Sequence, residues 1–358
     1  MLHIYPDFYN KFRCIAEACP DSCCTGWAVV VDEESECRFR ALPGELGEAL
    51  RKAMTVDEDG DTVFCRQPDG RCPFWMDNRL CRIEAELGAD APCETCRKFP
   101  RLTQDYGSFI EYGLTLSCPV AAELILKHQG PWEMISCEDG KPGEETDLDE
   151  IFLEDLRRIR EELLDELWQE DVPEGEAIGR LLAHGMCYEE GLDLGPGMED
   201  SMTCQDFSFA ITPQEQQQAI RSLLEAHLKL EILTPQWKAL LEEALSWEGE
   251  LPSVEHTGFA RNLATDHLYR HWLQAVNDGD CVTRLKLLAV NWLVVRTLAQ
   301  VHMAKHGELS GETWMMLLRL YAKEVGHDDV NLSALEDFLW EKEDDLNATV
   351  LAVLLTME

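Results

Sequence analysis

Cysteine is concentrated at one end of this 358-residue chain. Twelve of the fifteen cysteines lie within residues 1–137, and Cys14, Cys19, Cys23 and Cys24 fall within eleven residues. Thiolate ligands at such short spacing are typical of zinc and iron–sulfur sites. Free cysteines also serve as small apolar core residues, but that role does not require them to cluster. The clustering therefore predicts an N-terminal region that is held together by bound metal.

The cellular compartment determines whether clustered cysteines act as metal ligands or form disulfides. Residues 1–13 mix aromatic and polar side chains instead of placing a basic stretch before an apolar one, so no secretory signal peptide is predicted. We expect a cytoplasmic protein, in which thiols stay reduced and clustered cysteines bind metal or act in catalysis. The longest apolar run, Leu285 to Val301, is interrupted by Asn291 and Arg296. We therefore expect a buried helix there and no membrane partner.

The formal net charge of −38 limits the possible partners. Binding to nucleic acid through its phosphates requires a basic surface, so we expect no nucleic-acid partner. An acidic surface suits a basic partner and can steer it by long-range attraction. The alternative is that the acidic side chains only solvate the outer faces of helices.

The chain changes character near residue 138. Residues 1–137 are rich in Cys, Pro and Gly, whereas residues 151–358 have helical periodicity. The stretch between them, residues 138–150, is acidic and contains glycine, as surface linkers do. We expect a mainly α protein with a cysteine-rich, metal-bound N-terminal domain of short elements (1–137), an acidic linker (138–150) and an all-helical domain (151–358).

Several helix signals follow the linker. Apolar residues recur at three- and four-residue steps from Ile151 to Leu167, with Glu and Arg on the outer face. Thr212, Pro213 and Glu215 have the pattern of a capping box, and Thr234-Pro235 repeats the cap and the proline. Further helices are expected at residues 259–276, 281–304, 311–325 and 332–343.

A second group of cysteines follows the first one. It consists of Cys72-Pro73, Cys81, Cys96 in CRKFPR and Cys118 in SCP. All-sulfur ligands do not distinguish zinc from an iron–sulfur cluster, and adjacent cysteines such as Cys23 and Cys24 could serve two centres. Cys65 and Cys93 are intermediate between ligand and core residue. Ordinary burial is the favoured interpretation for five others: Cys37, Cys137, Cys187, Cys204 and Cys281.

The motifs, in their order and spacing, resemble the flagellin lysine-N-methylase family, part of a broader group named for a zinc- or iron-chelating cysteine motif. The resemblance covers residues 5–126 and is carried by YPDFYNKFRCIAEACPDSCCTGW, DGRCPFW, CETCRKFPRL and TLSCPVAAELIL. It implies methylation of flagellin lysines from S-adenosylmethionine and an iron–sulfur cluster, [4Fe–4S] in type, with zinc as the alternative. The metal ligands that it implies are Cys14, Cys19, Cys23, Cys24, Cys72, Cys81, Cys96 and Cys118.

The residues leave the mechanism open. Methyl transfer to an amine is a displacement that needs positioning and loss of a proton. Radical S-adenosylmethionine chemistry usually has Cys-x3-Cys-x2-Cys, but Gly26 stands where the third cysteine after Cys19 and Cys23 would be. The run LDLGPG at 192–197 is similar to a conventional cofactor-binding motif, but without a βαβ pattern it is interpreted as a turn. No catalytic residue is predicted, and the competing function is a non-enzymatic zinc- or iron-binding protein.

Overall fold

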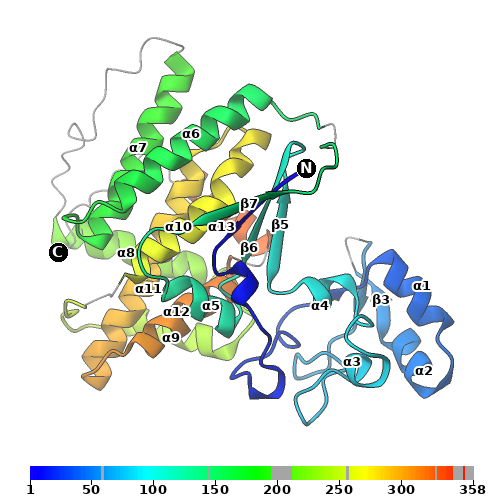
Figure 1. The fold of residues 1–358 in the computed structure, drawn as a ribbon. Coiled ribbons are helices and arrows are strands. Elements are labelled where there is room, and N and C mark those ends of the chain that lie inside the picture. The colour runs from blue at the N-terminus through cyan, green and yellow to red at the C-terminus, as the bar shows by residue number, and fades with distance from the viewer. Residues whose placement is uncertain are drawn as a thin grey trace. The chain divides into compact units, whose positions relative to one another are not determined.

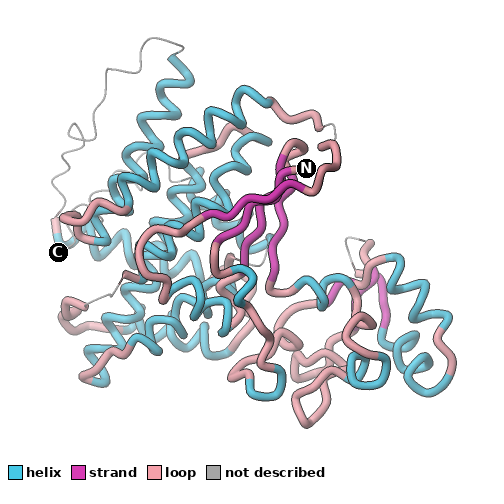
Figure 2. The backbone as a smooth tube through the Cα atoms, in the orientation of Figure 1, coloured by secondary structure: helices cyan, strands magenta, loops and turns pink. Residues whose placement is uncertain are grey.

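The first strand of the chain lies inside a four-stranded sheet, in the order β5-β6-β1-β7. β1 (Leu2–Pro6) pairs in parallel with β6 (Phe109–Leu114), with Leu2 opposite Phe109. On its other side it pairs antiparallel with β7 (Met134–Glu138), with Leu2 opposite Glu138. β5 (Arg101–Asp105) forms one edge of the sheet (Figure 2). The N-terminal residues are therefore part of a sheet that is built mostly from residues 101–138.

The computed structural model describes residues 1–57, 60–143, 146–194, 212–254, 258–326, 329–341 and 350. They form two compact units, which Figure 1 shows with the elements labelled. The smaller unit consists of residues 11–102 and 118–121, and the larger unit consists of residues 1–10, 103–117 and 122–358. The sequence placed the boundary at residues 138–150 instead. The difference arises because β1, β6 and β7 share one sheet, which joins residues 1–10 to the helical part.

The smaller unit is built from short elements. Its helices are η2 (Ala16–Ala18), α1 (Glu33–Ala41), α2 (Gly44–Ala53), α3 (Arg82–Leu87) and α4 (Glu94–Lys98). A three-stranded sheet in the order β2-β4-β3 joins β2 (Val29–Val30), β4 (Thr62–Phe64) and β3 (Met54–Val56). Phe39, Phe64 and Phe74 are almost fully buried in its core, where Cys93 also lies. The expected N-terminal region of short elements is confirmed, whereas the metal stays a prediction.

The larger unit carries the long helices. They are α5 (Pro119–Leu126, whose first residues belong to the smaller unit), α6 (Glu150–Leu167), α7 (Glu174–Leu194), α8 (Pro213–His227), α9 (Pro235–Ser246), α10 (Phe259–His271), η4 (Trp272–Asn277), α11 (Val282–His306), α12 (Gly311–Glu324) and α13 (Asp329–Glu341). A further short element, η1 (Tyr9–Lys11), follows β1. The expected helical C-terminal part is confirmed, with one difference: the helix expected at 259–276 becomes 3-10 from Trp272 onwards.

The caps that the sequence predicted are formed. The Thr212 hydroxyl accepts from the Glu215 amide, and the Glu215 carboxylate accepts from the Thr212 amide, so both halves of the capping box are present. Thr234 caps α9 by accepting from the Trp237 amide. Each cap satisfies backbone N–H groups that have no partner inside the helix. These local contacts explain why the helix starts could be predicted from the sequence.

α11 is the central helix of the larger unit. It packs against α7, α8, α9, α12 and α13. By length and composition it could cross a membrane, but 78% of its most apolar window is buried inside the structure. The expectation of a buried helix at Leu285–Val301 is thus confirmed. Where α11 meets α7, a Cβ at Gly185 would lie 2.3 Å from a Leu285 methyl carbon, so the two helices approach closely through a glycine.

Candidate functional site

All eight cysteines that the motifs single out lie in the smaller unit. Cys14, Cys19, Cys23 and Cys24 lie on the loops around η2, and Cys72 lies on the loop after β4. Cys96 lies in α4, while Cys81 and Cys118 immediately precede α3 and α5. Residues separated by as many as a hundred positions are therefore gathered in one small fold. The pairing of Cys72 N–H with Cys24 O at 2.7 Å holds the first and second cysteine groups together.

Cys93 belongs to this group, although it was not in the predicted ligand set. Its side chain is fully buried, and its Sγ lies 3.6 Å from the Sγ of Cys96. The hydrogen bond between the two thiols lowers the pKa of Cys93, against the effect of burial. Cys72 and Cys81 pack against the same core cluster as Cys93. The signal for Cys93 was present in the sequence as Cys-x2-Cys, a spacing common in metal-binding and redox sites.

Burial changes the acidity of these thiols. It raises the pKa of Cys72 to about 11, and the neighbouring thiols of Cys81 and Cys93 add to the rise. Burial likewise raises the pKa of Cys81. Around Cys118, burial raises the pKa and the thiols of Cys19 and Cys14 contribute. Because metals bind the thiolate, these thiols would have to release protons on binding, which makes the affinity depend on pH.

The donor set fits a thiolate-bound metal or cluster by its chemistry, because soft sulfur ligands favour zinc and iron–sulfur centres. Within the described residues, no three or more His, Cys, Asp or Glu side chains are grouped in a way that could hold a metal ion. The eight ligands that the motifs imply therefore stay a prediction, to which the structure adds Cys93 as a neighbour of Cys96.

The cysteines that were expected to be ordinary core residues divide into two classes. Cys281 is buried, as expected, and Cys187 is half-buried. Cys37 and Cys137 are exposed, so that expectation is wrong for them. Cys137 lies on β7, an edge strand of its sheet in which four of the five residues, on both faces, are exposed. Cys204 and the end of the LDLGPG run, residues 195–197, lie outside the described residues.

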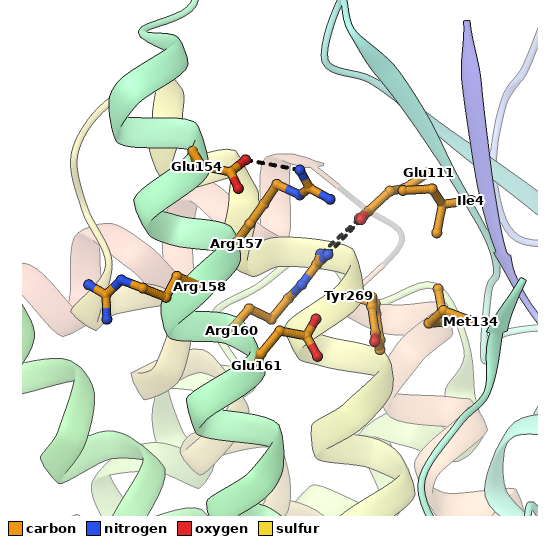
Figure 3. A pocket seen from close by; sticks show the side chains of 9 residues that line it. All are labelled: Ile4, Glu111, Met134, Glu154, Arg157, Arg158, Arg160, Glu161 and Tyr269. Atoms are coloured by element: carbon orange, nitrogen blue, oxygen red, sulfur yellow. Dashed lines mark hydrogen bonds and ion pairs between the residues drawn. The ribbon is translucent and has the colours of Figure 1, made fainter. Parts of the chain in front are cut away.

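The larger unit contains a cleft of about 300 Å³ between α6, α10 and the sheet (Figure 3). α6 contributes a charged face with i, i+3, i+4, i+7 spacing: Glu154, Arg157, Arg158 and Glu161. The other walls are Tyr269 from α10 and, from β1 and β7, the apolar side chains of Ile4 and Met134. The volume lies at the lower end of the range for small-molecule sites.

A buried ion pair forms the floor of this cleft. The Arg160 guanidinium donates to both Glu111 carboxylate oxygens, at 2.8 and 2.5 Å, and each side chain is only 4% exposed. Burial alone would lower the pKa of Arg160, but the hydrogen bonds and charge of Glu111 raise it. Arg160 also lies over the Tyr269 ring, 4.5 Å from its centroid. Each charge is therefore neutralised where the sheet meets α6.

A second cavity in the larger unit is enclosed by α10, α11 and α12 and is only about 40 Å³ in volume. It has room for a few water molecules, and not for a cofactor or a long side chain. Burial raises the pKa of Asp266 to about 7 and lowers the pKa of His267 to about 4. The Nε2–H of His267 donates to the Arg284 carbonyl, 2.6 Å away, so the ring is fixed in the core.

Sequence reasoning missed the cleft because its walls come from four separate segments. One signal was available: Arg160 follows Leu156 by four residues and so falls on the apolar face of the predicted helix. An arginine on a buried face requires a carboxylate partner. No sequence pattern indicated that the partner would be Glu111.

Comparison with known proteins supports the resemblance. The sequence model described as the FliB lysine N-methylase C-terminal domain matches residues 198–353. The lysine-N-methylase of Salmonella typhimurium is 29% identical over 126 residues, which is 34% of this chain and 31% of that protein. The flagellar biosynthetic protein FliU of Salmonella muenchen is 29% identical over 126 residues, 34% of this chain and 75% of that protein.

The lysine-N-methylase of Salmonella choleraesuis is 30% identical over 126 residues, which is 34% of this chain and 31% of that protein. The matched segment thus spans about a third of the length of the lysine-N-methylases. No solved structure matches the chain.

Proposed function

We propose that the chain is a lysine-N-methylase and that it transfers methyl groups from S-adenosylmethionine to lysine side chains of flagellin. The observation that carries this proposal is the agreement of two comparisons: a lysine N-methylase domain model that matches residues 198–353 and relatives named lysine-N-methylase. The name of a third relative, a flagellar biosynthetic protein, supports flagellin as the substrate.

The charge of the chain suits such a substrate. A net charge of −38 attracts a lysine-bearing surface and raises the rate of encounter. The same negative charge stabilises the protonated form of an approaching amine, which cannot attack. Burial of the amine would offset this effect, because removal from water favours the neutral form.

The transfer itself is a displacement at carbon. The lone pair of a neutral lysine nitrogen forms a bond to the methyl carbon, the bond from that carbon to the sulfonium sulfur breaks, and S-adenosylhomocysteine leaves. The nitrogen then loses one proton to water. No redox step is required, so the protein contributes chiefly orientation of the two reactants. We assign no general base.

We further propose that the smaller unit binds an iron–sulfur cluster through its cysteines. The thiols of Cys72, Cys81, Cys93 and Cys96 share one core and would supply ligands, and metal binding would have to draw them closer together than they lie in this structure. The cluster would supply cross-links that stabilise a unit of short elements. Stoichiometric zinc in place of iron would contradict the iron–sulfur assignment while leaving the thiol ligands in place.

The enzyme assay is direct. Protein purified without oxygen is incubated with S-adenosylmethionine and unmethylated flagellin, and the flagellin peptides are analysed by mass spectrometry. We expect a mass increase of one or more methyl groups on lysines, and none on flagellin whose lysines have been acetylated. No methylation by protein with its full metal content would contradict the proposal and favour the non-enzymatic metal-binding function.

A further inference from the structure

We propose that the cleft between α6, α10 and the sheet binds a lysine side chain, with the ammonium group at Glu161 and the alkyl stem against Ile4 and Met134. The preference for an alkylammonium group comes from the structure of the cleft alone. Only the choice of lysine among such groups rests on the proposed function.

The arginines of the cleft are already neutralised. Arg160 is held by Glu111, and Arg157 pairs with Glu154 at 2.9 Å. Arg158 lies 2.5 Å from Asp155 and 2.6 Å from Glu162, and in Figure 3 it points away from Tyr269. An incoming anion would have to compete with these carboxylates, and at Arg160 it would have to break a buried pair.

Among the charged residues that line the cleft, Glu161 is the one that is not paired with an arginine. Its carboxylate has no hydrogen-bond or ion-pair partner anywhere in the part of the chain that the structure describes. Figure 3 shows it beside Arg160, on the side of α6 that faces Tyr269. Of the three arginines in the lining, Arg160 is paired with Glu111, Arg157 with Glu154, and Arg158 with Asp155 and Glu162 outside the lining, so the Glu161 carboxylate is the charge left uncompensated. The cleft therefore favours a cation.

The apolar walls select the shape of that cation. Ile4 and Met134 come from adjacent strands and offer a surface for an alkyl chain, as lysine stems require when their charged end reaches a polar partner. Tyr269 is fixed between two neighbours, stacked on Trp132 at 5.7 Å and covered by Arg160. It forms a rigid wall, so the cleft does not need to rearrange around an incoming side chain.

The test uses the full protein labelled with ¹³C at its methionine methyl groups. The Met134 signal is identified from its loss in Met134→Leu. The protein is titrated at constant ionic strength with n-butylammonium chloride, sodium butyrate and n-butanol. We expect a saturable shift of the Met134 signal with n-butylammonium, and a much smaller one with the other two compounds.

Two variants on α6 provide the matched comparison. Glu161→Gln removes the proposed partner and should weaken n-butylammonium binding by tenfold or more. Glu162→Gln removes the same charge one residue away, where it contacts Arg158, and should leave binding within about twofold. Equal weakening in both variants, a stronger shift with butyrate, or no shift with n-butylammonium would overturn the proposal.

The outcome can be separated from that of the methylation assay. Binding of n-butylammonium at Glu161 without flagellin methylation would contradict the proposed function and leave an alkylammonium site. In an active enzyme, we expect Glu161→Gln to raise the KM for flagellin and leave that for S-adenosylmethionine unchanged. An unchanged KM for flagellin would overturn the lysine assignment alone.

Discussion

Arg160 and Glu111 form a bidentate ion pair that joins α6 to β6 almost out of contact with solvent. The two residues are far apart in the sequence. If one of them is removed, the charge of the other is buried and cannot be solvated by water. Such a pair contributes little net stability compared with apolar residues, but its disruption is costly. The pair therefore fixes how the helix lies on the sheet in the larger unit.

Removal of one partner should be strongly destabilising. We expect Glu111→Gln to lower the free energy of unfolding by about 3–5 kcal/mol, because it leaves the Arg160 charge buried without compensation. Urea denaturation measures this value. Glu154→Gln removes a carboxylate that is 74% exposed and should cost less than about 1 kcal/mol. Similar decreases in the free energy of unfolding in the two variants would show that the buried pair matters no more than an exposed one.

Removal of both partners should be much less harmful. In the double variant Glu111→Leu/Arg160→Met, we expect most of the stability lost in Glu111→Gln to return, since neither charge then remains buried. The comparison again uses urea denaturation. A double variant as unstable as the single one would mean that shape, rather than charge, decides this contact.

His227 should contribute to acid sensitivity. Burial lowers its pKa to about 4; its Nδ1 lies 2.7 Å from the Leu223 carbonyl, and its Nε2 lies 3.2 Å from the Tyr321 hydroxyl. The unfolded chain, with an ordinary histidine pKa near 6.5, takes up the proton first as the pH falls. As the pH falls from about 6.5 to 4, the free energy of unfolding therefore decreases by up to about 1.4 kcal/mol for each pH unit.

His227→Gln tests this contribution through the slope of stability against pH. The variant should lose about one proton from that slope, whatever its absolute stability. His267, whose pKa burial also lowers to about 4, acts in the same direction, and Asp266, whose pKa burial raises to about 7, acts in the opposite one. The difference between the wild type and the variant isolates His227. An unchanged slope would contradict its neutral state in the fold.

The close approach of α7 and α11 should not tolerate a methyl group. We expect Gly185→Ala to lower the free energy of unfolding by about 1–3 kcal/mol, because the Cβ would overlap Leu285, which is itself buried. Gly311→Ala is the control, since its Cβ would meet Phe259 at an ordinary 3.6 Å. Thermal unfolding should show a lower Tm for the first variant only. A higher Tm in both variants would indicate that the Leu285 side chain moves aside without cost.

Metal content should depend on the clustered cysteines and not on exposed ones elsewhere. We expect Cys96→Ala and Cys93→Ala to lose most of the iron found in anaerobically purified protein, together with its visible absorption. Cys37→Ala removes an exposed thiol in α1 and should keep both. Full iron content in the Cys93 and Cys96 variants would show that the ligands lie elsewhere.

Local signals account for what the sequence predicted well. Thr212 and Glu215 cap α8 through contacts within four residues, and the apolar rows of α6 and α11 are visible as periodicity. β1 contacts residues that lie more than a hundred positions away in the sequence. Arg160 contacts a partner that lies about fifty positions away. No short-range pattern encodes such contacts, so the units and the cleft could not be derived.

The place of β1 has a consequence for the order of events during synthesis. β1 precedes both of its partners in the chain, and β6 and β7 are made only after residues 11–102 have been translated. β7 is the last of the four strands to be made, so all residues of the cysteine-rich unit, 11–102 and 118–121, are translated before the sheet has its final strand. A nascent chain could thus take up metal before the larger unit folds, which makes maturation of the thiols an early step and assembly of the sheet a late one.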